Sequence, residues 1–428
     1  MIRSAFNLSQ IVQFAATCMF ILIFAMACSD NPSSAPELPV PDPTFGAIEV
    51  EVITTGDDDD PDGYTISIQG GESKEVDPNS TVTFTQVATG NVAISISEIP
   101  VHCQLDGDDS QSFTLGDNEV KNVQFDISCG PIFRDKILFM RSTGEAFEYQ
   151  IYSISPDGEN MRMVSDLILD GNASPVASPD GLRVLFSMAG TGSTVRQIYV
   201  MNADGSGMEN LSNNISRSHL NPVWSPDGTQ IAYSVIFMGS TARNDIFVMD
   251  ADGSNPVNIT NNPDLSDTSP SWSPDGNELI FSSSTVNSEG SNVFSINKIN
   301  ADGSGRTMLL EREGVILINP KWSPAGDGVA FERFVIGGAD GPRQIHRMNV
   351  DGSNIRNITA DGGFPNLATF SPSWSPDGRH IAFYTTSQSA LNIFIMTRDG
   401  VIEQGSITQG RNSQHHIMPS WSPFTRNW

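Results

Sequence analysis

Short runs that alternate between apolar and polar side chains fill this chain, and they predict strands rather than helices. Between residues 47 and 130 these runs are "AIEVEVIT", "GYTISIQ", "STVTFTQV", "NVAISISEI" and "VKNVQFDIS". Every second side chain in them is apolar, which is the period of a strand that is buried on one face. Several short strands at this spacing predict a small β-sandwich, immunoglobulin-like or prealbumin-like, over residues 47–130.

A different pattern follows, in which one strand–turn–strand unit occurs six times. The unit reads "NPVWSPDGTQIAY" at residues 221–233, and its relatives are "SPVASPDG", "SPSWSPDG" (twice), "NPKWSPAG" and "MPSWSP". The motif serines recur every 47 to 52 residues, at Ser178, Ser225, Ser273, Ser323, Ser375 and Ser422. A second motif, such as "IYVMNADGS", keeps the same step, with aspartates at Asp157, Asp204, Asp252, Asp302, Asp351 and Asp399. Two motifs in step indicate a repeat architecture.

Repeats of this length, built from strands and glycine turns, predict a six-bladed β-propeller over residues 131–428 and an all-β fold class. Ser-Pro-Asp-Gly suits a tight turn, because Pro presets φ, Asp caps its own backbone and Gly accepts positive φ. Each copy also has a proline two residues before the tryptophan position, and a sheet tolerates proline at an edge. This strand is therefore predicted to be the innermost strand of its blade.

The order of the motifs also predicts how the ring closes. The repeats begin on a strand of the second type, "KILFM" at 136–140, and end on a strand of the first type, "MPSWS" at 418–422. One blade cannot bury both of its faces, whereas six blades in a ring bury one another. We therefore expect the last strand to complete the first blade beside residues 136–140.

The motif pair P-x-W-S-P-D-G and "MNADGS" resembles the repeats of TolB-type six-bladed propellers, and the resemblance covers residues 134–428. It implies that fold, and it implies protein partners such as a peptidoglycan-associated lipoprotein. The small N-terminal domain of TolB is not evident, and the β domain takes its place. The resemblance therefore supports the fold more strongly than a role in the Tol system.

Residues 1–27 are predicted to be a lipoprotein signal peptide. Arg3 precedes the apolar run "IVQFAATCMFILIFAMAC", which is short for a membrane span. "AMAC", which ends at Cys28, resembles the lipobox of bacterial lipoproteins, in which the cysteine is lipidated and becomes the N-terminus. A plain secretory signal and an uncleaved anchor are the alternatives. Ser29 after the cysteine favours the outer membrane, facing the periplasm or the cell surface. The Pro- and Ser-rich residues 28–46 predict a tether.

Two further features of the predicted β domain bear on chemistry. Cys103 and Cys129 remain as a pair after export, and an oxidising compartment favours a disulfide between them over two buried thiols. The run "DDDDPDG" places Asp58, Asp60 and Asp62 at the spacing that opens a calcium loop. A weak Ca²⁺ site is one interpretation. A solvated hairpin loop is the other, since Gln69 stands where a closing Glu is needed.

Charge and motif content narrow the function. The net charge of −27 argues against nucleic acid, whose binding needs a basic patch. No nucleophile elbow, Walker loop or dinucleotide-binding glycine motif is present. Counting five residues back from the tryptophan position gives His219, Asp267 and His416 as candidates for the channel mouth, either as a polar rim or as metal ligands. Propeller lyases that act on pectin fragments hold a metal through histidines in a comparable place. The motif tryptophans are interpreted as packing residues rather than as platforms for sugars.

These observations favour a lipid-anchored propeller of the cell envelope that is not an enzyme and binds an envelope protein. The first alternative is a glycan-binding or carbohydrate-active propeller, related to metal-dependent lyases. The second is a protein in which the β domain binds the partner and the propeller acts as a spacer. No cofactor is predicted apart from the calcium candidate. The membrane is expected to be contacted through the lipid anchor only.

Overall fold

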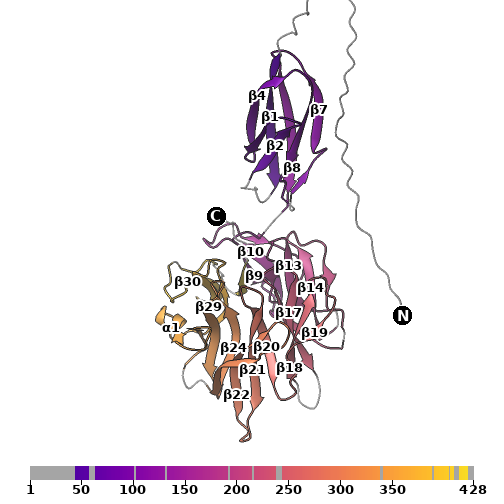
Figure 1. Cartoon of the computed structure of the whole chain (residues 1–428). Helices are drawn as coiled ribbons and strands as arrows, with labels where there is room; N and C mark the ends of the chain where they lie inside the picture. Colours follow the sequence, from indigo (N-terminus) through magenta and orange to yellow (C-terminus); the bar gives the residue numbers. More distant parts are fainter. Residues whose placement is uncertain are drawn as a thin grey trace, which may run out of the picture.

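Nearly all of the regular structure is β-strand (Figure 1). The computed structural model describes residues 44–56, 63–100, 103–130, 133–190, 193–214, 216–237, 243–337, 341–387, 390–403, 405–408 and 414–422. The one helix in these ranges is α1 (Ile358–Asp361), so the predicted all-β fold class is confirmed. No helix of the described residues is long and apolar enough to cross a membrane. Cys28, the predicted signal and the three aspartates of the calcium candidate lie outside the described residues.

Two four-stranded sheets form the N-terminal part of the structure and share one hydrophobic core. The first sheet has the order β4 (Ser80–Ala88), β1 (Phe45–Gly56), β8 (Val120–Cys129) and β6 (Cys103–Leu105). The second has the order β3 (Ser73–Val76), β2 (Tyr64–Ile68), β5 (Gly90–Ser97) and β7 (Ser110–Leu115). Alternation along β1 sends Ile48, Val50 and Val52 into the core, where they join Ile66 of β2 and Ile94 of β5.

Cys103 and Cys129 form a disulfide within the first of these sheets. They lie opposite one another where β6 pairs with β8, with their Cα atoms 3.9 Å apart. The bond joins residues that are 26 positions apart in the sequence. Closing a loop of this length stabilises the fold by about 3 kcal/mol in the chain-entropy account.

Six further sheets follow in the described residues from 133 onwards. We call these sheets blades and give their strands from the innermost outwards: the first blade has β31 (His416–Trp421), β9 (Ile137–Ser142), β10 (Tyr149–Ile154) and β11 (Arg162–Met163), and the second has β12 (Val176–Ala177), β13 (Arg183–Ala189), β14 (Arg196–Asn202) and β15 (Glu209–Asn210). The third blade has β16 (His219–Trp224), β17 (Gln230–Phe237), β18 (Arg243–Asp250) and β19 (Val257–Asn258), and the fourth has β20 (Ser266–Trp272), β21 (Glu278–Val286), β22 (Asn292–Asn300) and β23 (Thr307–Glu313). The fifth blade has β24 (Val315–Trp322), β25 (Val329–Val335), β26 (Gln344–Met348) and β27 (Arg356–Asn357), and the sixth has β28 (Thr369–Trp374), β29 (His380–Ser387) and β30 (Ala390–Thr397).

The innermost strands of these sheets form a closed ring. Each of β12, β16, β20, β24, β28 and β31 contacts the next, and β31 contacts β12. The ring closes where β31 pairs with β9, with His416 opposite Arg141 and Trp421 opposite Ile137. The predicted pairing of the last strand with residues 136–140 is therefore confirmed.

The Ser-Pro-Asp-Gly motif forms the turn between the first and second strands of a blade. In the third blade the hydroxyl of Ser225 donates to Asp227 (2.6 Å) and accepts from the backbone N–H of Gln230 (2.9 Å). Gly228 follows with a φ of 71°, which suits glycine. The same pair of serine bonds recurs at Ser273 and Ser375.

The Asp-Gly turn between the third and fourth strands lies against the preceding blade. Gly352 has a φ of 83°, and a Cβ atom there would lie 2.1 Å from the backbone oxygen of Leu309. A Cβ atom at Gly205, Gly253 or Gly400 would lie 2.3 to 2.4 Å from a backbone oxygen of the blade before it in the same way. These glycines therefore let neighbouring blades approach closely, in addition to allowing the turn.

Replacing Gly352 by alanine should destabilise the protein by roughly 3 kcal/mol, since the strain of positive φ adds to overlap with the Leu309 carbonyl. Gly290 is the matched control, because its φ is 81° and a Cβ atom added there would have no other atom within 4 Å. Gly290→Ala should lose only about 1 kcal/mol. Urea unfolding of the two variants measures the difference, and equal losses would contradict the role assigned to blade contact.

Candidate functional site

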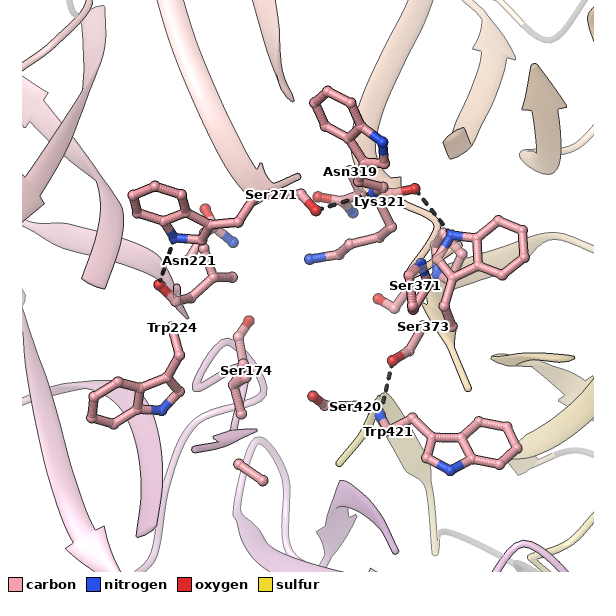
Figure 2. Close-up of a pocket in the computed structure, with 18 of the residues that line it drawn as sticks. Ser174, Asn221, Trp224, Ser271, Asn319, Lys321, Ser371, Ser373, Ser420 and Trp421 are labelled. Atoms are coloured by element: carbon pink, nitrogen blue, oxygen red, sulfur yellow. Dashed lines mark hydrogen bonds between the residues drawn. The ribbon is translucent and has the colours of Figure 1, made fainter. Parts of the chain in front are cut away.

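A cavity of about 680 Å³ runs along the axis of the ring, and the innermost strands line it (Figure 2). We call this cavity the central channel. Three positions of each repeat contribute to its wall: the residue before the motif proline, the residue after that proline, and the tryptophan position. The second proline of the turn also adds to the wall in the five repeats for which the structure describes it.

The residue before the motif proline has an unusual backbone in all six repeats. Its φ lies between 48° and 57°, at Ser174, Asn221, Ser269, Asn319, Ser371 and Met418. Non-glycine residues seldom adopt this left-handed conformation. In β16, β20, β24, β28 and β31 the pairing with the next strand shifts register at this point, as a β-bulge does. All six residues lie on the wall of the channel, and in these five strands the bulge accounts for their place there.

The bulge also explains why the predicted channel-mouth residues lie elsewhere. In a regular strand, residues four apart share a face, so His219 would face the channel together with Val223. The extra residue of the bulge reverses that relation. His219, Asp267 and His416 are 4%, 0% and 2% exposed, and none of them lines the channel. The expectation that they form its mouth is corrected accordingly.

Each of the three residues is held inside its own blade. The ring of His219 lies 5.4 Å from the ring of Tyr233, and the ring of His416 lies 5.5 Å from that of Phe139. Burial lowers the pKa of both histidines to about 4. Asp267 accepts two hydrogen bonds from Arg306, at 2.8 and 2.9 Å, and one from Ser283. Within the described residues no group of three His, Cys, Asp or Glu side chains is arranged to hold a metal ion.

The motif tryptophans pack between neighbouring blades. Trp224, Trp272 and Trp374 are buried and belong to hydrophobic clusters that join adjacent sheets. The indole N–H of Trp374 donates to the backbone oxygen of Lys321 (3.0 Å), and that of Trp272 to Val223 (3.4 Å). These three rings are therefore packing residues, as the sequence suggested, and only parts of them reach the channel wall.

Lys321 is the one ionisable residue among the described residues that line the channel. It occupies the position after the motif proline, where the other five repeats have Val176, Val223, Ser271, Ser373 and Ser420. Its side chain reaches into the open centre (Figure 2). Burial lowers the pKa of its amine, and the charge of Glu332 opposes that shift. In the sequence, "NPKWSPAG" differs from the other copies at this position, so Lys321 could have been singled out. The predictions relied instead on the residues that the copies share.

A buried carboxylate supports the wall beside Lys321. Glu332 is fully buried on β25 and accepts hydrogen bonds from the side chain of Asn319 (2.6 Å) and from the backbone N–H of Ser371 (2.9 Å). Arg343 donates to its other oxygen at 3.1 Å. Burial raises the pKa of Glu332. Because Asn319 and Ser371 belong to neighbouring blades, this carboxylate holds the two bulges at a fixed separation.

The chemistry of the wall suits binding. Hydroxyls, amides, indoles and prolines form it, together with one amine, and the described lining residues include no Asp, Glu, His or Cys. Serine and lysine can act as nucleophiles when a general base activates them, and among these lining residues the amine of Lys321 is the one such base. A cavity of this volume lies within the range of ordinary ligand sites.

Comparisons with known proteins agree with this architecture. The TolB beta propeller domain family matches residues 128–425. TolB from Acinetobacter baumannii has a similar structure, with a TM-score of 0.51 and 18% identity over 68% of this chain and 67% of that one. Hydrazine synthase from Kuenenia stuttgartiensis has a TM-score of 0.54 and 15% identity, over 70% of this chain and 48% of that one. No curated protein matches the chain.

Enzymes also occur among the similar structures. Oligogalacturonate lyase from Vibrio parahaemolyticus has a TM-score of 0.41 and 16% identity, over 62% of this chain and 71% of that one. A TM-score this low supports no argument about function. At these identities the similar structures show a shared fold alone, and the fold is one that both binding proteins and enzymes use.

Proposed function

Since the chain belongs to the TolB beta propeller domain family, we propose that it is a non-enzymatic propeller that binds a protein of the bacterial cell envelope. The observation that carries the proposal is the composition of the central channel. Its wall offers hydrogen-bonding groups and apolar surface, and the described lining residues include no carboxylate, imidazole or thiol. Such a wall can hold a segment of a partner, and it offers one amine, that of Lys321, without a second acid or base to work with it at a substrate.

The proposed location follows from the sequence that precedes the two folded parts. "AMAC" at residues 25–28 fits a lipidation site, and the Pro- and Ser-rich segment up to residue 46 fits a tether. The disulfide between Cys103 and Cys129 suits an oxidising compartment outside the cytoplasm. We therefore propose that the protein is held at the outer membrane by a lipid on Cys28.

A crosslinking pull-down from intact cells tests the proposal. The full chain carries an affinity tag in the tether and is compared with two variants, Ser420→Tyr and Thr307→Tyr. The first adds a ring to the channel wall, at a register position where the chain itself accepts Val, Ser and Lys. The second adds the same ring on β23, where Thr307 is exposed. We expect one envelope protein to be recovered with the parent chain and with Thr307→Tyr, and at least tenfold less of it with Ser420→Tyr.

Two results would contradict the proposal in different ways. Failure to recover any protein partner with the parent chain would remove the protein-binding function. Equal recovery with both variants would support a protein partner but would show that its binding site lies outside the channel. Thermal unfolding of Ser420→Tyr, compared with the parent chain, checks that a loss of recovery is not caused by misfolding.

A further inference from the structure

The repeats of this protein provide an internal control for Lys321. Five other residues occupy the same register position on five equivalent strands, and all five are serine or valine. The blade therefore needs no lysine there in order to fold. The structural contacts of this residue come from its backbone, which pairs with Ala330 of β25 and accepts the indole N–H of Trp374 at 3.0 Å. The long cationic side chain is an addition to the repeat that the fold does not explain.

The position of the amine is unfavourable unless something binds it. Lys321 is half-buried, and burial lowers the pKa of its amine because the charged form is poorly solvated there. Within the described residues no side chain forms a hydrogen bond or an ion pair with Nζ. The nearest influence of opposite sign, Glu332, already binds Asn319, Arg343 and the backbone of Ser371.

The surroundings of the amine favour an anionic group as its partner. Figure 2 places Lys321 across the open centre from Ser420, with Ser373 between them along the wall. The hydroxyl of Ser373 already accepts the backbone N–H of Trp421 (2.8 Å), and that of Ser271 accepts the backbone N–H of Trp322 (3.1 Å). An oxyanion would add the strong acceptor that this ammonium lacks. The whole chain is strongly acidic, with a net charge of −27, so the long-range field does not draw anions to the channel and the local contact with the amine has to hold one.

We propose that Lys321 binds a carboxylate that an extended segment of the partner protein brings into the central channel. The inference rests on the proposed function, since it names the chemistry of the partner's contact. A cavity of about 680 Å³ admits a short length of chain and excludes a folded domain. The carboxylate belongs either to a Glu or Asp side chain or to the C-terminus of the partner, and both are the same chemistry at Nζ.

Zero-length coupling of amines to carboxylates tests the contact directly. A carbodiimide joins a lysine amine to a carboxylate as an amide when the two are in contact, with loss of one water. The full tagged chain is treated in intact cells and recovered, and mass spectrometry of the digest locates the joined peptides. The chain has five lysines, Lys74, Lys121, Lys136, Lys298 and Lys321, so the coupled position is read without ambiguity. The mass of the attached peptide shows whether a side chain or a C-terminus is joined.

We expect the partner to be coupled at Lys321 through one defined carboxylate. The variant Lys321→Ser, which copies the residue of three other repeats, should fold normally and should recover at least tenfold less partner. Lys298→Ser is the matched control, because Lys298 pairs with Glu278 on the fourth blade (2.8 Å), and it should recover as much as the parent chain. Lys321→Arg keeps the charge, and it should retain most of the partner while losing the coupling.

The outcomes separate this inference from the proposed function. Recovery of a partner with coupling confined to the other four lysines, or undiminished recovery with Lys321→Ser, would overturn the role of Lys321 and leave the protein-binding function intact. A parent chain that recovers no partner would overturn both. Normal thermal unfolding of Lys321→Ser excludes misfolding as the cause of a lost interaction.

Discussion

Lowering the pH from 7 to 5 should reduce the free energy of unfolding of this protein by roughly 6 kcal/mol. Three buried histidines cause the loss: His219, His346 and His416, whose pKa values burial lowers to about 4. The positive charges of Arg217 near His219 and of Arg141 near His416 lower the pKa values further. Each ring is buried, and two of them pack against Tyr233 and Phe139.

The sign follows from where the protons bind. A histidine in the unfolded chain titrates near pH 6.5, so below that pH the unfolded state binds more protons than the folded state. The free energy of unfolding therefore has its full value above pH 6.5, where the rings are neutral in both states, and it decreases as the pH falls towards 4. Each histidine then contributes about 2 kcal/mol of the loss by pH 5. Glu332 acts in the opposite direction, because its pKa is raised and its stabilisation is lost as the pH rises.

Urea unfolding at pH 7, 6 and 5 measures this dependence. The double variant His219→Phe/His416→Phe keeps a ring at each site and removes the titrating group, so the pH-dependent loss should shrink to about one third. His380→Phe is the control, since His380 is only half-buried, beside Glu403. A double variant that loses as much stability as the parent chain between pH 7 and 5 would show that these histidines are not the cause.

Removing the carboxylate of Glu332 should destabilise the protein by roughly 3 to 5 kcal/mol. Glu332→Ala leaves the side chain of Asn319 and the N–H of Ser371 without their acceptor, and it leaves Arg343 without its anion. The guanidinium of Arg343 also stacks over Phe334 and Phe370, at 4.4 and 5.0 Å, so it cannot turn freely to solvent. The side chain of Arg343 is 29% exposed, so the cost comes mainly from the N–H groups of Asn319 and Ser371, which lose their acceptor.

Thermal or urea unfolding tests the prediction against a matched surface change. Glu311→Ala removes a carboxylate from β23, where Glu311 is exposed, and should change the stability by less than about 0.5 kcal/mol. Glu332→Gln should fall between the two, because an amide oxygen still accepts from Asn319 and Ser371. If Glu332→Ala and Glu311→Ala unfold alike, the carboxylate does not hold the bulges together.

The repeats made the propeller and the pairing of its strands predictable. Their period fixed the blades, and the position of "KILFM" and "MPSWS" in that period determined the pairing of β9 with β31. The Ser-Pro-Asp-Gly turns could be predicted because their bonds are local, as between Ser225 and Asp227. The disulfide between Cys103 and Cys129 could be predicted because the N-terminal segment indicates export to an oxidising compartment.

The channel wall was not predictable in the same way. The bulge at Asn221 and its equivalents falls directly before the motif proline, and that proline was interpreted as the mark of an edge strand although proline also occurs at bulges. A count along the strand therefore assigned His219 to the wrong face. Lys321 stood out in the sequence as an exception to the repeat, but its role depends on which face of its strand lines the channel.

The pairing of β31 with β9 has a consequence for how this chain reaches its folded state. The contact joins the two extremes of the propeller, so the ring has high contact order and cannot close until the last described strand is available. Until then β9 keeps one unpaired edge, and the two blades on either side of the gap expose their apolar faces. The propeller therefore stays an open array of blades until β31 has been made, however early the other blades form.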